Sequence, residues 1–185
     1  GVVAVRLDSN AKPIDTSPIL LAEGSPTGVV TEVAIASDGN DWLVVWAADH
    51  VRARIVKRSG VTGPVIDFTP ADAPSTSPTV AWNGTAYVIA WVRLTSIDYS
   101  CPIPECGPLY EGDIVVSRLT RDGTLIDTAP IELAVDPENQ GQPAIAVSPN
   151  GTALIAWVSE SVDSPWESSI RAASLSSDGV TTPSS

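Results

Sequence analysis

The 185-residue sequence has no methionine, a single histidine and a single phenylalanine. Its apolar runs are short, and none approaches the ~20 residues that a membrane-spanning helix needs, so we expect no membrane insertion. No Gly-x-Ser-x-Gly elbow, glycine-rich phosphate loop or EF-hand pattern is present. Histidine-dependent catalysis would rest on His50 alone, which we expect to be a surface residue. The absent initiator methionine indicates that Gly1 is a processed or excised end.

Positive charge is also scarce, because 10 basic residues face 22 acidic ones and the formal net charge is −12. An acidic surface repels phosphate backbones and anionic lipid headgroups, so nucleic acid and membrane surfaces are excluded as partners. The remaining partner classes are neutral or positively charged, such as a carbohydrate or a protein ligand.

The two cysteines, Cys101 and Cys106, lie close together in a proline-rich segment. Two cysteines alone are too few for a metal site, and four intervening residues are too many for a redox pair. The spacing therefore favours a local disulfide. A disulfide indicates an oxidising compartment, so we expect the protein to be extracellular or displayed at the cell surface.

The most informative feature that is present is an apolar run that occurs three times and closes with tryptophan near its end. The runs cover residues 42–47, 86–92 and 153–158, with Trp46, Trp91 and Trp157 at matching places. Each run follows an Asp-Gly or Asn-Gly turn and a shorter apolar segment, which predicts a β-hairpin. We expect the three tryptophans to occupy equivalent core positions between neighbouring sheets.

Each hairpin is followed by a third segment of mixed polarity, then by a second glycine turn and a fourth strand that contains proline. Arg6, Lys57, Arg118 and Ser174 mark the third segments at spacings of 51, 61 and 56 residues. A period of this size is typical of arrays of repeated units. The repeat divides the chain into the outer strands of one blade (1–28), a blade (29–72), a blade with a long insertion (73–136) and a further blade (137–185).

These residues resemble the bacterial secreted repeat proteins whose blades carry a tryptophan that closes the second strand and an Asp-Gly turn after the third. The resemblance covers essentially the whole chain and implies an all-β fold. That fold is a β-propeller-like array of four-stranded antiparallel blades, about three to three and a half of them. A β-sandwich remains the main alternative, and a helix over residues 41–59 is a further one. Propellers typically need four to eight blades, so the resemblance implies either a piece of a longer propeller or a ring completed by another copy.

The insertions between the second and third strands indicate where a ligand could bind. They run over residues 94–112 and 159–168, and in a propeller they emerge on one face. Aromatic and acidic side chains in these loops suit a sugar, a basic peptide or Ca²⁺. The candidate binding residues are Asp98, Tyr99, Tyr110, Glu111, Asp163, Trp166 and Glu167. A stapled loop without a ligand is the alternative interpretation.

Repetition without a catalytic motif favours a secreted, non-catalytic binding or scaffold module. The alternative is a fragment of a propeller glycosidase or lyase whose active site lies mostly on other blades. The sequence predicts no catalytic residue and no resident cofactor or metal, with Ca²⁺ as a weak option. Expected partners are a carbohydrate or protein ligand, together with further blades of a longer chain or a second copy.

Overall fold

The computed structural model describes residues 1–23, 30, 32–68, 74–98, 109–135, 137–161, 167–179 and 181–183. All regular structure within these ranges is β-strand, and they contain no helix that could cross a membrane. The strands are β1 Val2–Ala4, β2 Ile19–Ala22, β3 Glu32–Ser37, β4 Trp42–Ala47, β5 Val51–Val56, β6 Thr62–Asp67, β7 Ser75–Trp82, β8 Tyr87–Asp98, β9 Leu109–Leu119, β10 Ile131–Ala134, β11 Asn139–Val147, β12 Ala153–Glu160, β13 Ser168–Leu175 and β14 Thr181–Pro183.

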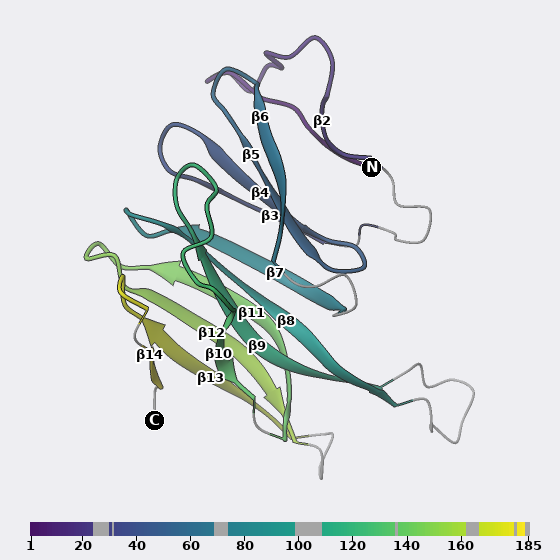
Figure 1. Ribbon diagram of the computed structural model, residues 1–185, viewed down its shortest axis with the longest axis vertical. Helices are drawn as coiled ribbons and strands as arrows, with labels where there is room; N and C mark the ends of the chain where they lie inside the picture. The colour runs from purple at the N-terminus through teal and green to yellow at the C-terminus, as the bar shows by residue number, and fades with distance from the viewer. Residues whose placement is uncertain are drawn as a thin grey trace.

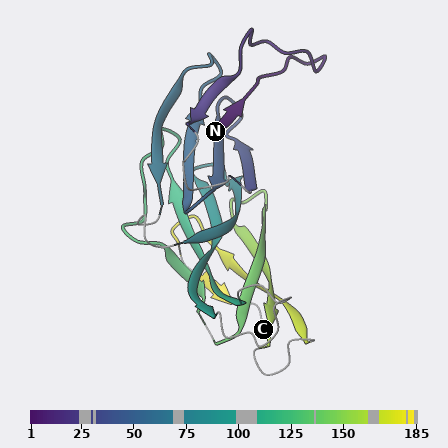
Figure 2. The same ribbon diagram turned by 90° about the vertical axis from the view of Figure 1, so that its right-hand side faces the viewer.

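The strands form three four-stranded antiparallel sheets and one two-stranded sheet. The first sheet holds β3–β6, the second β7–β10 and the third β11–β14, with strands adjacent in each sheet in chain order. The β1–β2 pair stands alone before the first sheet. The sheets follow one another along the long axis of the molecule (Figures 1 and 2), with the β1–β2 pair at one end and β14 at the other. This arrangement confirms the all-β, propeller-like array of blades and is not a β-sandwich.

The middle sheet takes part in two hydrophobic cores, because successive residues of a strand point to opposite faces. In β8, Tyr87, Ile89 and Trp91 pack against the first sheet, and Val88 and Ala90 pack with the third. A strand buried on both faces needs an unbroken apolar sequence, which explains why the central run is more apolar than the strands around it.

The three repeated tryptophans occupy equivalent positions, as the sequence predicted. Trp46, Trp91 and Trp157 expose 1, 0 and 5 % of their surface. Trp46 packs with Val2 and Leu21 of the preceding β1–β2 pair, while Trp91 packs with the first sheet and Trp157 with the second. Each tryptophan therefore seals its own sheet onto the sheet before it.

An arginine–aspartate pair joins neighbouring sheets at two of the three contacts. Arg118 pairs with Asp127 of its own sheet and donates from Nη1 to the Ser177 carbonyl of the next sheet at 2.7 Å. Arg6 repeats this arrangement with Asp15 and the Arg58 carbonyl. The Arg6 hydrogen bonds hold the pKa of the Asp15 carboxyl below its ordinary value. We call each of these groups a latch.

Each latch depends on the glycine of the turn that it reaches. Gly60 and Gly179 have φ values of +90° and +89°, a region that favours glycine. A Cβ atom would lie 2.9 Å from Arg6 Nη2 at Gly60 and 2.7 Å from Arg118 Nη2 at Gly179. The second glycine turn of the repeat therefore serves two needs, since it reverses the chain and leaves room for a guanidinium group.

At the contact between the first and second sheets, the position that a latch occupies elsewhere is filled by apolar side chains. Around Gly123 the nearest atoms are the Cδ1 atoms of Ile66 and Ile55, which would lie 3.1 and 3.2 Å from an added Cβ. The strand register aligns Ile55, not Lys57, with Arg118, because Trp46 pairs with Arg52 and Trp91 with Val115. The sequence spacing built on Lys57 was therefore wrong by two residues.

Candidate functional site

The ends of β4, β8 and β12 and the starts of the strands that follow them lie at one end of the sheets. The β8–β9 hairpin projects furthest there, as Figure 1 shows. The predicted loop over residues 94–112 is shorter than expected, because pairing continues to Asp98 opposite Leu109. Both strands extend in this way with an irregular step in the register between Leu94 and Ser96.

The structure places only some of the predicted binding residues. Asp98 and Tyr110 are strand residues near the tip of the long hairpin, and Glu111 pairs with Ser96. Glu167 accepts a 3.1 Å hydrogen bond from the Ser161 amide through its carbonyl oxygen. The other predicted residues lie outside the described ranges, namely Tyr99, Cys101, Cys106, Asp163 and Trp166.

His50 is buried, with 3 % of its surface exposed, so the expectation of a surface histidine was wrong. Its Nε2 atom lies 2.9 Å from Asp67 Oδ1, and its Nδ1 atom lies 3.2 Å from Asp49 Oδ1. Arg52 contacts both of these carboxylates. The ring thus serves as a polar link at the short turn between β4 and β5, which explains its burial.

The first strands of the second and third sheets, β7 and β11, each carry a bulge directly before a proline. Both bulges lie at the end of the sheets that bears the long hairpin. Ser77 and Gln142 have φ values of +53° and +52° and precede Pro78 and Pro143. Proline cannot donate a ladder hydrogen bond, so it favours such an irregularity. At the β7 bulge, Glu32 of the first sheet accepts a 2.7 Å hydrogen bond from Thr76 Oγ1 and another from the Ser77 amide.

A groove of about 260 Å³ lies beside the β11 bulge, between the second and third sheets. We call it the interblade groove. Val92, Leu94 and Val158 supply its apolar surface, and hydroxyl, amide and carboxylate groups supply the rest. Its polar members are Thr76, Ser77, Asn139, Gln140, Gln142 and Glu160.

A second hollow, of about 320 Å³, is lined mainly by serine hydroxyls and two carboxylates. Glu138 accepts a hydrogen bond from Ser159 Oγ and lies 2.5 Å from Arg171 Nη2. Glu167 also lines this hollow, so it is the predicted binding residue that the structure does bring into a pocket. In the interblade groove, the Asn139 Nδ2 atom lies 3.4 Å from Glu160 Oε2.

The chemistry of the interblade groove is that of a binding site for an uncharged polar molecule. Hydroxyls and amides both donate and accept hydrogen bonds, and none of the described residues that line the groove is cationic. The apolar surface beside them is typical of ligand pockets. Across the residues that the structure describes, no group of three or more His, Cys, Asp or Glu residues could hold a metal ion.

The sequence pattern did not point to these residues because the insertions were taken as the place of the site. The predicted strands began after these segments, at Thr79 and Ala144, so Thr76 to Pro78 and Gly141 to Pro143 were assigned no role. The signal that could have found them is the proline inside β7 and inside β11, because a proline within a strand predicts a bulge and an irregular, hydrogen-bonding surface.

Gly112 and Gly141 provide a matched test of the packing around the interblade groove. A Cβ at Gly112 would lie 2.4 Å from Val92 Cγ1 and 2.9 Å from the Gln140 carbonyl oxygen. We expect Gly112→Ala to lower the free energy of unfolding by ~1–3 kcal/mol through overpacking. An added Cβ at Gly141 meets no atom of the described residues within 4 Å. Gly141→Ala should therefore be close to neutral in urea unfolding, and equal losses for the two variants would contradict this geometry.

Comparison with known proteins gives a fold but no family. No protein-family profile matches the sequence, and no curated protein matches it either. Solved structures do resemble it. An α-L-arabinanase from Cellvibrio cellulosa complexed with arabinohexaose gives a TM-score of 0.55 at 10 % identity. An exo-1,5-α-L-arabinanase from a bovine ruminal metagenomic library gives 0.59 at 12 % identity.

Each of these two comparisons covers 96 % of this chain and 64 % of the other. An endo-arabinase from Bacteroides thetaiotaomicron gives a TM-score of 0.55 at 13 % identity over 94 % of this chain and 68 % of its own length. The chain thus spans slightly less than two thirds of the first two arabinanases. At such low identity the likeness shows the fold alone, and that fold is the β-propeller.

Proposed function

We propose that this chain binds a neutral polysaccharide in the interblade groove, as part of a propeller of the glycoside hydrolase type. The observation that most supports this proposal is the lining of the groove. Hydroxyl and amide groups lie beside apolar side chains there, and no described lining residue is cationic. Sugars present the same two chemistries, namely ring faces that pack on apolar surface and hydroxyls that exchange hydrogen bonds. Anionic glycans fit less well, because the chain has a net charge of −12.

The position of the groove supports the proposal. It lies at the end of the sheets where the β8–β9 hairpin projects, and loops and hairpins on a rigid scaffold commonly carry binding residues. The bulges at Ser77 and Gln142 are backbone irregularities of the kind that cluster at binding sites.

Arabinan is the first polysaccharide to test. The arabinanases share the propeller fold, and the Cellvibrio cellulosa enzyme is complexed with arabinohexaose. Hydrolysis is the second candidate function, and the observation that favours it is a pair of carboxylates, Glu138 and Glu160, that flank Asn139 in the two hollows. An extracellular setting belongs to the same proposal, because the disulfide expected between Cys101 and Cys106 would need an oxidising compartment.

The test is to titrate the chain with arabinohexaose, cellohexaose and an oligogalacturonide in a calorimeter. We expect binding of a neutral hexasaccharide and none of the acidic one. Gln142→Gly retains the positive φ and Glu160→Gln retains the shape, and each should weaken binding about tenfold, the loss of one hydrogen bond to a polar or charged group. Glu23 is an exposed carboxylate that directly follows β2, so Glu23→Gln is the control and should bind normally.

Unaltered affinity in both groove variants would contradict the location, and no binding of any neutral glycan would contradict the function. Release of reducing ends from arabinan during the same incubation would assign hydrolysis, and Glu160→Gln should then abolish it while glycan binding persists at reduced affinity.

A further inference from the structure

The first sheet presents an apolar face that, among the described residues, the β1–β2 pair covers in part. Val33 and Ile35 of β3 are 64 and 61 % exposed. They lie on the same face as the buried Trp46, because Val33 pairs with Trp46 and Ile35 with Val44. The covered side is the one near β5, where Val2 and Leu21 contact Trp46 and Val56.

The equivalent face of the second sheet is fully covered. Val80 holds the place there that Ile35 holds in the first sheet, since Val80 pairs with Ile89 as Ile35 pairs with Val44. Val80 is 9 % exposed, because the β3–β4 hairpin of the preceding sheet packs on it through Ala34 and Ala36. The difference between the two positions is therefore the hairpin that lies over one and has no counterpart over the other in the described part of the chain.

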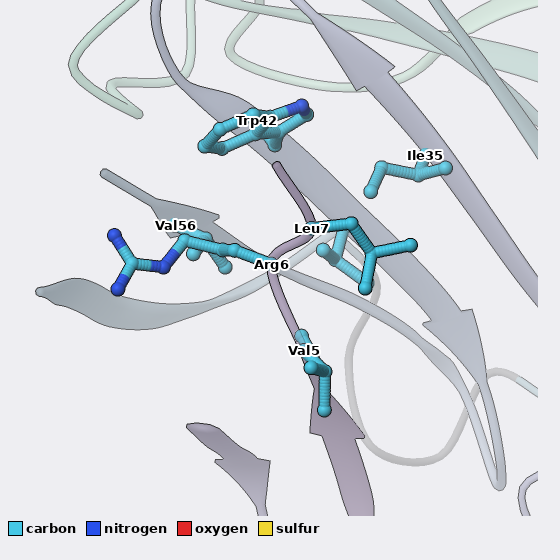
Figure 3. A pocket seen from close by; sticks show the side chains of 8 residues that line it. Val5, Arg6, Leu7, Ile35, Trp42 and Val56 are labelled. Carbon is cyan, nitrogen blue, oxygen red and sulfur yellow. The ribbon is translucent and has the colours of Figure 1, made fainter. Parts of the chain in front are cut away.

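A hollow of about 270 Å³ marks the uncovered area. It is lined by Ile35, Trp42 and Val44 on one side and by residues 4–7 on the other. In Figure 3 the Leu7 side chain lies on the side of Ile35, while the Arg6 guanidinium extends away from it toward its latch. The hollow is thus apolar and continues along the chain that leads out of β1.

Strand β1 also has an open edge beside this hollow. Among the described strands it pairs only with β2, although its counterpart β5 pairs with both β4 and β6. Arg6 and Arg118 hold the same place in their latches, and the strand register aligns Arg118 with Ile55. Arg6 therefore corresponds to Ile55, and Val2, four residues earlier, corresponds to Val51. The further neighbour of β1 would then be the counterpart of β4, and an unpaired strand edge is a template for strand addition.

We propose that this edge and hollow bind a two-stranded β-hairpin from a polypeptide segment outside these 185 residues, completing the β1–β2 pair to a four-stranded sheet. The contacts already present in the chain indicate which residue types this hairpin should present. The β3–β4 hairpin, which fills the equivalent position over the second sheet, presents Ala34 and Ala36 from its first strand and Leu43 and Val45 from its second. A whole sheet from a second copy is the wrong occupant, because β1 and β2 already fill the outer half of the face.

The inference is independent of the glycan proposal and is tested by adding the hairpin. A second copy of residues 32–50, which contains β3, β4 and the short turn before Val51, is fused directly ahead of Val2 in the full chain. Hydrogen exchange of residues 2–7 should slow at least ~10-fold as their open edge is paired.

The control is the same fusion with Leu43→Asp and Val45→Asp in the added copy only, which should leave the exchange of residues 2–7 as in the original chain. A peptide of residues 32–47 added in trans to the unfused chain gives a second measurement, with slower exchange of residues 2–7 as the expected result. The proposal is overturned if the folded fusion exchanges residues 2–7 at the original rate, or if the aspartate control protects equally. A dimer of the original chain that the fusion dissociates would assign the face to a second copy instead.

Discussion

Replacing Trp91 with alanine should lower the free energy of unfolding by ~3–5 kcal/mol, the range for removing a large aromatic side chain from a core. Trp91 has no exposed surface, and its ring centroid lies 5.6 Å from that of Phe68 at the end of the first sheet. The alanine variant would leave a cavity between two sheets that the strands cannot close without losing their register. Loss of this size is a large fraction of the stability of an ordinary domain.

Two comparison variants separate cavity formation from other causes. The Trp91 indole nitrogen is buried without a hydrogen-bond acceptor among the described residues, so Trp91→Phe removes no hydrogen bond and should cost clearly less than alanine. Leu154→Ala, at a residue that is 50 % exposed on the outer face of the third sheet, should change stability by less than ~1 kcal/mol. Urea unfolding monitored by circular dichroism measures the stability of all three variants. A change below ~1 kcal/mol for Trp91→Ala would contradict the role of Trp91 in packing the second sheet against the first.

Removing Asp127 should cost about as much, for an electrostatic reason. The side chains of Arg118 and Asp127 are 10 and 9 % exposed, and Asp127 raises the pKa of the Arg118 guanidinium above its ordinary value. Asp127→Ala would leave this cation buried without its partner, and breaking buried pairs in this way costs ~3–5 kcal/mol. The free energy of unfolding in urea at neutral pH is the measurement.

The chain supplies its own control for this pair. Around Gly123 two isoleucines, Ile55 and Ile66, occupy the place that a latch occupies around Gly179. The double variant Arg118→Ile with Asp127→Ile should therefore be more stable than Asp127→Ala, because it buries apolar groups and leaves no charge unpaired. If the double variant is the less stable of the two, the latch contributes through its hydrogen bond to Ser177 and not through charge pairing alone.

The repeat and its tryptophans could be predicted from the sequence because both follow from local patterns. Strands buried on both faces need continuous apolar runs, and turns with positive φ need glycine, so residues 86–92 and the turn at Gly84 were recognisable. The alignment failed at Ile55, where the repeat replaces a charged latch with an apolar contact. A substitution of that kind preserves the space that is filled and changes every residue type used to find it.

The candidate site was harder to predict because its residues come from separate sheets. Thr76 and Glu160 lie far apart in sequence and meet only because the second and third sheets pack together. The burial of His50 likewise depends on Asp67, which β6 brings back beside β5. Of the residues predicted on the insertions, Glu167 is the one that the described part of the structure places in a hollow.

Because β4 and β8 each contribute one face to each of two cores, the third sheet differs from the first two when the molecule opens locally. Loss of the β13–β14 edge would expose one face of one core, and the rest could persist. Loss of β8 would remove a wall from both cores at once. In a linear array whose stability is a sum of unit and neighbour terms, unfolding should therefore begin at the β13–β14 edge, and the core that β4 and β8 share between the first and second sheets should persist longest.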